Sequence, residues 1–295
     1  MRVLRRPDVT GSRRCTNTVS GQNGRVPILN KDMTLCISLA ARPTDIGTRF
    51  HNYLYEELGL NYIYKAFTTT DLPAAITGVR GLGIRGCAIS MPFKEDVIAL
   101  VDRLDPSAQA IDSVNTIVND DGVLTAYNTD YLAVARLLRG HAVPATHSVL
   151  VRGSGGMAKA VVAALRDAGF DRVRIVARNE RTGRALAGQY GFAWQAEVEE
   201  PAADLLINVT PLGMTGDDAD VVAFPQHAID AARVVFDVVA SPSETPLVIA
   251  ARETGKPVIT GAEVVALQAE EQFVLYTSIR PTPEQVRAAG KFSRR

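Results

Sequence analysis

Short apolar runs alternate with longer amphipathic stretches along the chain from Thr34 onward. The short runs are bounded by glycine or polar residues, as buried parallel strands are. The longer stretches place apolar side chains three or four residues apart, which predicts helices with one buried face. In this first part of the chain we predict strands at 34–40, 62–67 and 86–90, and helices at 48–58 and 72–83.

The pattern then becomes mixed. Residues 93–104 have helical spacing and predict a third helix. Residues 113–130 instead hold two alternating runs separated by Asp121-Gly122, a dipeptide typical of a tight hairpin. A long helix is predicted at 131–140, and we expect it to connect two domains.

A glycine-rich turn within 149–169 joins a β-branched run to an amphipathic helix. Gly153 can adopt the tight turn, Gly155 lets the backbone approach a pyrophosphate, and Ala158 lets the helix pack closely on the strand. A second apolar run at 172–177 completes a β-α-β unit. Because the helix dipole and free N–H groups would face a phosphate, this context favours a dinucleotide-binding turn over a purely structural one.

The second half of the chain continues the alternation, which predicts two α/β domains in all. The further elements that we predict are strands at 204–210, 233–240 and 257–260, and helices at 263–276 and 283–292.

Composition excludes several classes of protein. Lys and Arg total 32, as do Asp and Glu, so net charge indicates neither nucleic acid nor an anionic membrane as a partner. No apolar run approaches the roughly 20 residues that span a bilayer. The scattered cysteines fit a reducing cytoplasm, and the isolated histidines have no metal-ligand spacing, so we expect a metal-free site. These residues are Cys15, Cys36, Cys87, His51, His141, His147 and His227.

Residues 1–31 are rich in arginine and small polar residues and have almost no apolar periodicity. The arginine and serine content is compatible with a transit peptide, but no amphipathic helix and no secretory apolar region are visible. We therefore favour a flexible leader, or an extended start ahead of Met33.

Two charged residues stand where the pattern predicts strand-to-helix junctions. Lys94 falls in the first turn of a predicted helix, where the helix dipole disfavours an ammonium group. Asp130 can be read as an ordinary helix cap and Lys94 as a solvated surface lysine. From residue spacing alone, the structural interpretation of each residue and a catalytic role are about equally well supported.

Seven sequence blocks follow one another between about Met33 and Thr277: SMPFK, SVNTIV, AYNTD, GSGGMAKA, INVTPLGM, FDVVASPSETPL and GAEVVALQAEEQF. In the order and spacing of these blocks the chain resembles the shikimate dehydrogenase family. The resemblance implies an N-terminal catalytic α/β domain followed by a C-terminal Rossmann NADP-binding domain, with the last helices packing back on the catalytic domain. The boundaries that we expect are 32–131 with 264–295 for the catalytic domain and 132–263 for the Rossmann domain.

The resemblance also implies the reaction, which is reversible reduction of 3-dehydroshikimate to shikimate with NADPH. The family's catalytic lysine and its partner aspartate fall on Lys94 and Asp130, and its substrate-binding positions on Ser90, Asn115 and Gln268. This assignment is chemically reasonable, because alcohol oxidation removes a hydroxyl proton while hydride leaves the same carbon, so an acid/base group must lie within reach.

The family grips the substrate carboxylate with two serines in an SxSPxxHN pattern, and here that stretch reads DIGTRFHN. Asp45 and Gly47 stand at the two serine positions, so we include both as substrate-binding positions. A carboxylate facing the substrate's carboxylate is unfavourable unless a cation such as Arg42 or Arg49 intervenes. The departure resembles a divergent, shikimate dehydrogenase-like branch, for which quinate or an amino-substituted analogue is the alternative substrate.

The cofactor is expected to be NADP, with NAD less favoured. The loop ARNERTGR has Glu180 where the family's NRT-type loop has arginine, but Arg178 and Arg181 flank it and can bracket a 2′-phosphate. The cofactor-binding residues that motif and resemblance indicate are Gly153, Ser154, Gly155, Gly156, Met157, Ala158, Arg178, Asn179, Arg181, Thr210 and Gly261.

One function of another class stays open at this point, a low-turnover NADP-binding sensor or regulator on the same scaffold. Loss of the serine pair motivates it, whereas retention of the lysine, aspartate, asparagine and glutamine favours a dehydrogenase. We expect a small-molecule substrate and a monomer or homodimer, with neither nucleic acid nor membrane as partner.

Overall fold

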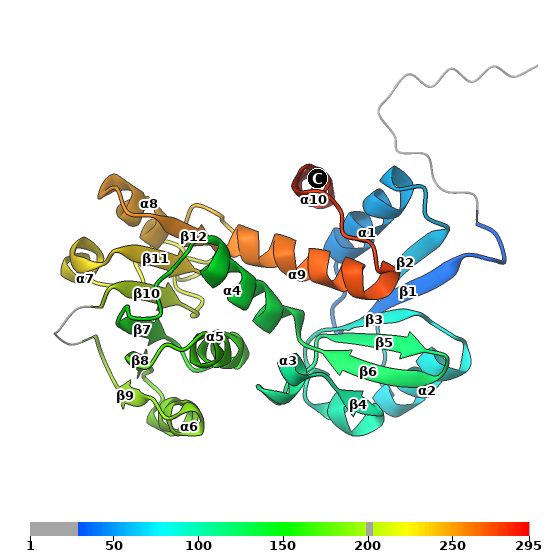
Figure 1. The fold of residues 1–295 in the computed structure, drawn as a ribbon, viewed down its shortest axis with the longest axis horizontal. Helices are drawn as coiled ribbons and strands as arrows, with labels where there is room; N and C mark the ends of the chain where they lie inside the picture. The colour runs from blue at the N-terminus through cyan, green and yellow to red at the C-terminus, as the bar shows by residue number, and fades with distance from the viewer. Residues whose placement is uncertain (1–28, 199–202, 295) are drawn as a thin grey trace, which may run out of the picture. The chain divides into compact units, whose positions relative to one another are not determined.

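The computed structural model describes residues 29–198 and 203–294, so the leader predicted at 1–31 lies almost wholly outside the described residues. From Asp32 onward the described chain builds two six-stranded sheets flanked by helices (Figure 1). None of the helices in this part of the chain is long and apolar enough to cross a membrane.

The first sheet is mixed. Its first three strands are parallel, and an antiparallel hairpin follows them. In sheet order the strands are β2 (Tyr62–Phe67), β1 (Thr34–Leu39), β3 (Gly86–Ile89), β5 (Thr116–Asp120), β6 (Val123–Tyr127) and β4 (Arg103–Leu104). The predicted hairpin is confirmed, with Asp121 and Gly122 both at positive φ, 51° and 90°, as a type I′ turn requires.

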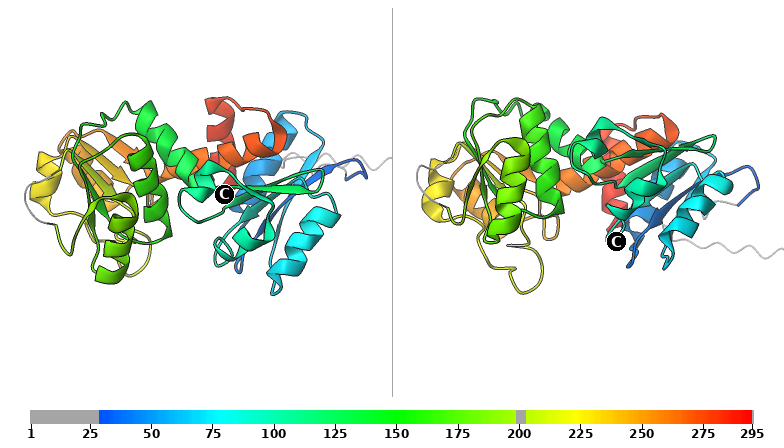
Figure 2. Two further views of the ribbon diagram at one scale, coloured as in Figure 1. Left: turned by 60° about the horizontal axis from the view of Figure 1, so that its bottom comes forward. Right: turned by 90° about the horizontal axis from the view of Figure 1, so that it is seen from below.

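Both faces of this sheet are buried, which explains the near-continuous apolar runs. Side chains alternate along β1, so Cys36 packs among aromatic residues of α1 (Asp45–Glu57) while Ile37 faces α2 (Leu72–Gly81). The helix α10 (Pro283–Ser293) lies beside α1 (Figure 2). This agrees with the expectation that the last helices pack back on the N-terminal part of the chain.

The prediction of a helix at 93–104 is wrong. A turn leads into a short 3₁₀ helix, η1 (Asp96–Leu100), and the next residues form strand β4. The backbone N–H of Asp102 donates to Leu124, and its carboxylate accepts from the N–H of the same residue. Pairing with the hairpin therefore satisfies the backbone groups that a helix would have used, and tertiary context overrides helical spacing.

The second sheet is entirely parallel, and the predicted β-α-β unit at 149–177 is confirmed by the parallel pairing of β7 with β8. Its strands in order are β12 (Val258–Thr260), β11 (Val234–Asp237), β10 (Leu205–Asn208), β7 (Val149–Arg152), β8 (Val173–Val176) and β9 (Ala193–Gln195). Counted from β7 this is the 3-2-1-4-5-6 order of dinucleotide-binding sheets. The helices that accompany it are α5 (Gly156–Asp167), α6 (Glu180–Tyr190), α7 (Gln226–Ala231) and α8 (Pro246–Glu253).

Two helices join the part of the chain that forms one sheet to the part that forms the other. The first, α4 (Thr129–Gly140), leads from β6 towards β7, and the short α3 (Pro106–Gln109) packs against it. The second, α9 (Gly261–Thr277), starts at β12 and packs against α4, β3 and β5 (Figure 1). The N-cap of α4 is Asn128, whose side chain accepts from the N–H of Tyr131, so the capping role considered for Asp130 is wrong.

Candidate active site

A cavity of about 300 Å³ lies where the carboxyl ends of β1 and β3 meet residues of α1, α9 and α10. The structure brings six of the seven predicted catalytic and substrate-binding residues to its wall: Lys94, Asp130, Ser90, Asn115, Gln268 and Gly47. Asp45 is the exception, because its side chain is 77% exposed, pairs with Arg49 at 3.7 Å and is not part of the wall.

Lys94 and Asp130 form an ion pair in the wall of this cavity. The Lys94 Nζ donates to the Asp130 Oδ2 at 2.9 Å, and the two side chains are 31% and 20% exposed. Lys94 belongs to the turn that precedes η1, not to a helix, and Asp130 belongs to the first turn of α4. A primary amine that is held by a carboxylate and reaches a cavity can exchange a proton with a bound hydroxyl group.

Asn115 presents its amide to the same cavity. Its side chain is buried, at 3% exposed, and its Oδ1 accepts from the backbone N–H and hydroxyl of Thr129 and from the hydroxyl of Thr116. Because these bonds fix the oxygen, the Nδ2 is the group left over, and it has no partner among the described residues. A buried donor without a partner is costly, so this amide is a binding group for a ligand oxygen.

Among the polar residues of this wall that sequence reasoning missed are Gln272 and His51. Gln272 lies one helical turn after Gln268, and its amide donates to the Thr116 hydroxyl at 3.0 Å. Helical spacing from Gln268 was the available signal for Gln272. For His51 the available signal was the HN of the family pattern, which falls on His51 and Asn52.

The His51 imidazole is 1% exposed and stacks on Tyr64, with ring centroids 4.5 Å apart and planes 9° apart. Neither ring nitrogen meets hydrogen-bond geometry with a described residue, although the side chain of Gln272 interacts with the ring and opposes part of the effect of burial on its pKa. Burial lowers the pKa of His51 to about 3, so the ring is neutral at physiological pH.

We expect His51 to make the fold sensitive to acid. The unfolded chain binds the proton at its ordinary pKa and the folded chain does not, so stability that is present above the ordinary pKa is lost as pH falls towards the lowered one. Between about pH 7.5 and about pH 5 this amounts to about 2 kcal/mol. Urea unfolding of the wild type and of His51→Phe, which keeps a stacked ring, should differ in this pH-dependent loss. Equal losses would contradict the assignment.

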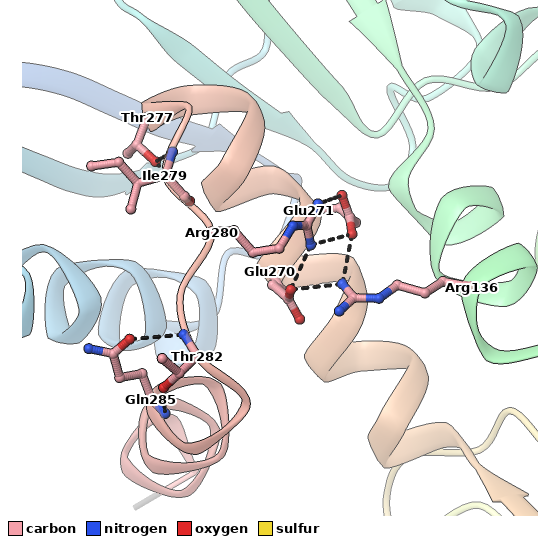
Figure 3. A network of polar contacts seen from close by, with 8 residues as sticks. All are labelled: Arg136, Glu270, Glu271, Thr277, Ile279, Arg280, Thr282 and Gln285. Carbon is pink, nitrogen blue, oxygen red and sulfur yellow. Dashed lines mark hydrogen bonds and ion pairs between the residues drawn. The ribbon is translucent and has the colours of Figure 1, made fainter. Parts of the chain in front are cut away.

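Two carboxylates of α9 are each clamped by two arginines, which fixes the helix that carries Gln268 and Gln272. Figure 3 shows Arg136 from α4 and Arg280 from the loop after α9 on opposite sides of Glu270 and Glu271. The Nη1 of each arginine lies 2.7 Å from Glu270 Oε1 and 2.9 Å from Glu271 Oε1. Burial alone would raise the pKa of Glu271, but the hydrogen bonds and charges of Arg280 and Arg136 outweigh burial and lower it.

Removing one arginine of this network should destabilise the fold measurably. In Arg280→Ala, Glu270, which is 5% exposed, keeps Arg136 as its sole remaining arginine partner among the described residues. We expect the free energy of unfolding to fall by about 1 to 2 kcal/mol, the scale of lost hydrogen bonds between charged groups with one exposed partner. Arg287→Ala, at an exposed position of α10, is the matched control for urea unfolding. Equal stability of the two variants would show that the network contributes little.

A second cleft, of about 1030 Å³, lies at the carboxyl ends of β7, β8 and β10. Of the predicted cofactor residues it is lined by Gly153, Ser154, Arg178, Asn179 and Thr210. The structure does not bring the others to the wall of this cleft. They are Gly155, Gly156, Met157, Ala158, Arg181 and Gly261.

The glycine turn has the geometry that a dinucleotide requires. Gly153 has φ of +124°, and a Cβ there would lie 2.8 Å from Val209, so the tight turn needs glycine. Gly155 is the N-cap of α5 with no side-chain cap, and a Cβ added to it would meet open space. Ala158 is fully buried, in keeping with the predicted close packing. The start of α5 thus leaves its free N–H groups available to a phosphate.

Close packing explains why position 261 is a glycine. A Cβ at this position would lie 2.3 Å from the carbonyl oxygens of Val238 and Val239. The first residue of α9 must therefore be glycine for the helix to start against the end of β11.

Arg152 is a cleft residue that sequence reasoning missed. It is the last residue of β7, next to Gly153, and its guanidinium donates to the carbonyl of Ala223. Burial lowers the pKa of Arg152, and the nearby positive charge of Arg178 lowers it further. Two like charges held together in one cleft favour an anionic ligand. The signal in the sequence was an arginine directly before the glycine turn.

No group of three or more His, Cys, Asp or Glu that could hold a metal ion occurs among residues 29–198 and 203–294. A parallel sheet in this strand order with a glycine turn, together with a cavity that holds a lysine–aspartate pair and an unpartnered amide, defines a dinucleotide-dependent oxidoreductase of small polar substrates.

Comparisons with known proteins identify the family. A family model described as the shikimate dehydrogenase substrate binding domain matches residues 46–117. A shikimate dehydrogenase-like protein of Haemophilus influenzae is 55% identical over 268 residues, which cover 90% of this chain and 99% of that protein. The chain therefore belongs to the shikimate dehydrogenase family.

Solved structures agree with this assignment. A shikimate 5-dehydrogenase-like protein has a TM-score of 0.90 at 55% identity, covering 91% of this chain and 100% of its own. Shikimate 5-dehydrogenase of Thermus thermophilus, solved in complex with NADP(H) and shikimate, has a TM-score of 0.77 at 29% identity and covers 88% of this chain and 99% of its own.

Proposed function

We propose that this protein is an NADP-dependent oxidoreductase that interconverts shikimate, or a related cyclic hydroxy acid, and its 3-dehydro form. The observation that carries the proposal is the 2.9 Å pair of Lys94 and Asp130 in the wall of a small polar cavity. Relatives named as shikimate dehydrogenases support the same reaction.

Each polar group in the cavity has a role in this proposal. The Lys94 Nζ removes the proton of the reacting hydroxyl during oxidation and returns it during reduction, while Asp130 orients the amine. The Nδ2 of Asn115 donates to a ring hydroxyl of the substrate, since the hydrogen bonds from Thr129 and Thr116 leave that amide no other use. Gln268 and Ser90 bind further hydroxyl groups.

The second cleft fits NADP. When bound, the cofactor supplies the nicotinamide that accepts or returns hydride. The uncapped start of α5, which follows the cleft residues Gly153 and Ser154, would hold its pyrophosphate. Arg178 together with Arg152, which both line the cleft, would hold the 2′-phosphate. Ser154 and Thr182, whose hydroxyls lie 2.7 Å apart, link the glycine turn to the start of α6 beside this site.

The proposal includes the domain organisation, with residues 32–131 and 264–295 binding substrate and 132–263 binding the dinucleotide. It also includes action in the cytoplasm as a monomer or homodimer without nucleic acid. The balanced net charge and the buried free thiols of Cys36 and Cys87 support these points.

A panel of substrates and cofactors tests the function. Purified protein is mixed with NADP or NAD and with shikimate, quinate or an amino-substituted analogue, and reduced nicotinamide is followed by its absorbance. We expect turnover with NADP and shikimate to exceed every other pair. Faster turnover of another acid would replace shikimate as the substrate, and absence of turnover with every acid, despite NADP binding, would favour a sensor.

A further inference from the structure

Part of the cavity wall comes from the loop after β1 and the first turn of α1. Arg42, Pro43, Thr44, Ile46 and Gly47 line the cavity in succession. None of the described carboxylates forms an ion pair with Arg42, which is an exposed residue. A cation that no described carboxylate neutralises therefore stands at the edge of the substrate cavity.

The helix α1 begins in this wall without a side-chain cap. Thr44 is the N-cap residue, but its hydroxyl accepts no backbone N–H. The helix is 13 residues long, so its dipole adds positive potential where Thr44 and Gly47 line the cavity. Asp45, in the first turn of this helix, is not part of the cavity wall and pairs with Arg49 at 3.7 Å.

A buried group in the same cavity indicates that it is built for a polar ligand. The Asn115 Nδ2 has no partner among the described residues, although this side chain is 3% exposed. Groups of this kind are costly to bury unless a ligand or water satisfies them.

The helix α10 adds a second cation. Gly290, Ser293 and Arg294 line the cavity from the end of this helix, and Arg294 has no ion-pair partner in the described part of the chain. The start of the helix is held by a reciprocal capping box between Thr282 and Gln285, just after the Arg280 clamp (Figure 3).

The charges of the cavity do not balance without a ligand. Its charged wall residues are Lys94, Asp130, Arg42 and Arg294, and the first two neutralise each other. We propose that Arg42, supported by the start of α1 and by Arg294, is the binding site for the substrate's carboxylate, which makes this protein selective for hydroxy acids over uncharged polyols. Guanidinium groups suit this role because they bind carboxylates through paired, charge-assisted hydrogen bonds. The inference rests on the proposed function, since it assumes that the substrate is a hydroxy acid.

The test compares shikimate with its uncharged methyl ester in wild type, Arg42→Gln and Arg294→Gln. Arg287→Gln is the matched control, because Arg287 is an exposed arginine of α10 that lies outside the cavity wall. We expect Arg42→Gln to raise the KM and the Kd for shikimate by about tenfold or more and to leave the values for the ester nearly unchanged. Arg294→Gln should act in the same direction but less strongly, and Arg287→Gln should have no effect.

The outcomes separate this inference from the proposed function. Equal losses for acid and ester, or no loss for either, would overturn the carboxylate site while turnover of shikimate still supports the function. If no hydroxy acid is turned over, the proposed function fails, and calorimetric Kd values for shikimate and the ester still decide whether Arg42 recognises the carboxylate. A preference for the acid that Arg42→Gln abolishes upholds the site in either case.

Discussion

Replacement of Lys94 with alanine should lower kcat by at least about 100-fold, the scale of general acid–base assistance, while the Kd for NADP stays nearly unchanged. The reason is geometric. The Lys94 Nζ is held 2.9 Å from Asp130 in the cavity wall, and it is the one lysine among the described wall residues. Without it, none of these residues offers an amine that can exchange the hydroxyl proton.

Steady-state kinetics with the best substrate and calorimetric titration with NADP measure this effect. Lys65→Ala is the matched control, because Lys65 is an exposed lysine of β2 outside both cavities. Unchanged turnover in Lys94→Ala would remove this residue from the mechanism. A parallel loss of NADP affinity would mean that the substitution disturbs more than the reacting group.

The second large effect concerns the cofactor. Arg178→Ala should weaken NADP binding by about 10- to 100-fold and leave NAD binding within about twofold, because only NADP carries the 2′-phosphate that a charge-assisted hydrogen bond would hold. Arg152→Ala should act in the same direction, since Arg152 and Arg178 line one cleft and lie close enough for the charge of one to lower the pKa of the other.

Arg181→Ala is the matched control for the cofactor prediction. The sequence favoured Arg178 and Arg181 alike, but Arg181 is exposed on α6 and does not line the cleft. Equilibrium Kd values for NADP and NAD decide the matter. Equal weakening of both cofactors by Arg178→Ala, or a selective loss of NADP in Arg181→Ala alone, would contradict this assignment of the 2′-phosphate site.

Local signals predicted most of the fold. The apolar runs became strands because both faces of each sheet are covered, and Asp121-Gly122 formed the expected hairpin turn. The failure at residues 93–104 has the opposite cause. Their spacing suits a helix, but Arg103 and Leu104 pair with Thr125 and Ala126 of a strand that comes later in the chain. Pairing between distant segments is invisible to a local pattern.

The candidate site was predictable only in part. The glycine turn and the strand-to-helix junctions indicated where Gly153, Lys94 and Asp130 lie, and family resemblance suggested their roles. The folded structure adds side-chain contacts that neither the local pattern nor the resemblance contained. It stacks His51 on Tyr64, and it directs the amide of Asn115 into the cavity through hydrogen bonds from Thr129 and Thr116.

The loop that departs from the family pattern shows the same limit. From the sequence, Arg42 and Arg49 were equal candidates for the cation beside the substrate carboxylate. The structure separates them, because Arg49 is engaged by Asp45 outside the cavity whereas Arg42 lines it. The orientation of the first turn of α1 makes the difference, and residue spacing did not specify it.

The most direct test of the central claim uses shikimate deuterated at the carbon that carries the 3-hydroxyl. Wild-type protein is incubated with this substrate and oxidised NADP, and the reduced nicotinamide is isolated for mass spectrometry. The account predicts one deuterium in each molecule of reduced cofactor, formed at a rate that Lys94→Ala lowers at least about 100-fold. Reduced cofactor without deuterium, or no reduction although NADP binds, would contradict it.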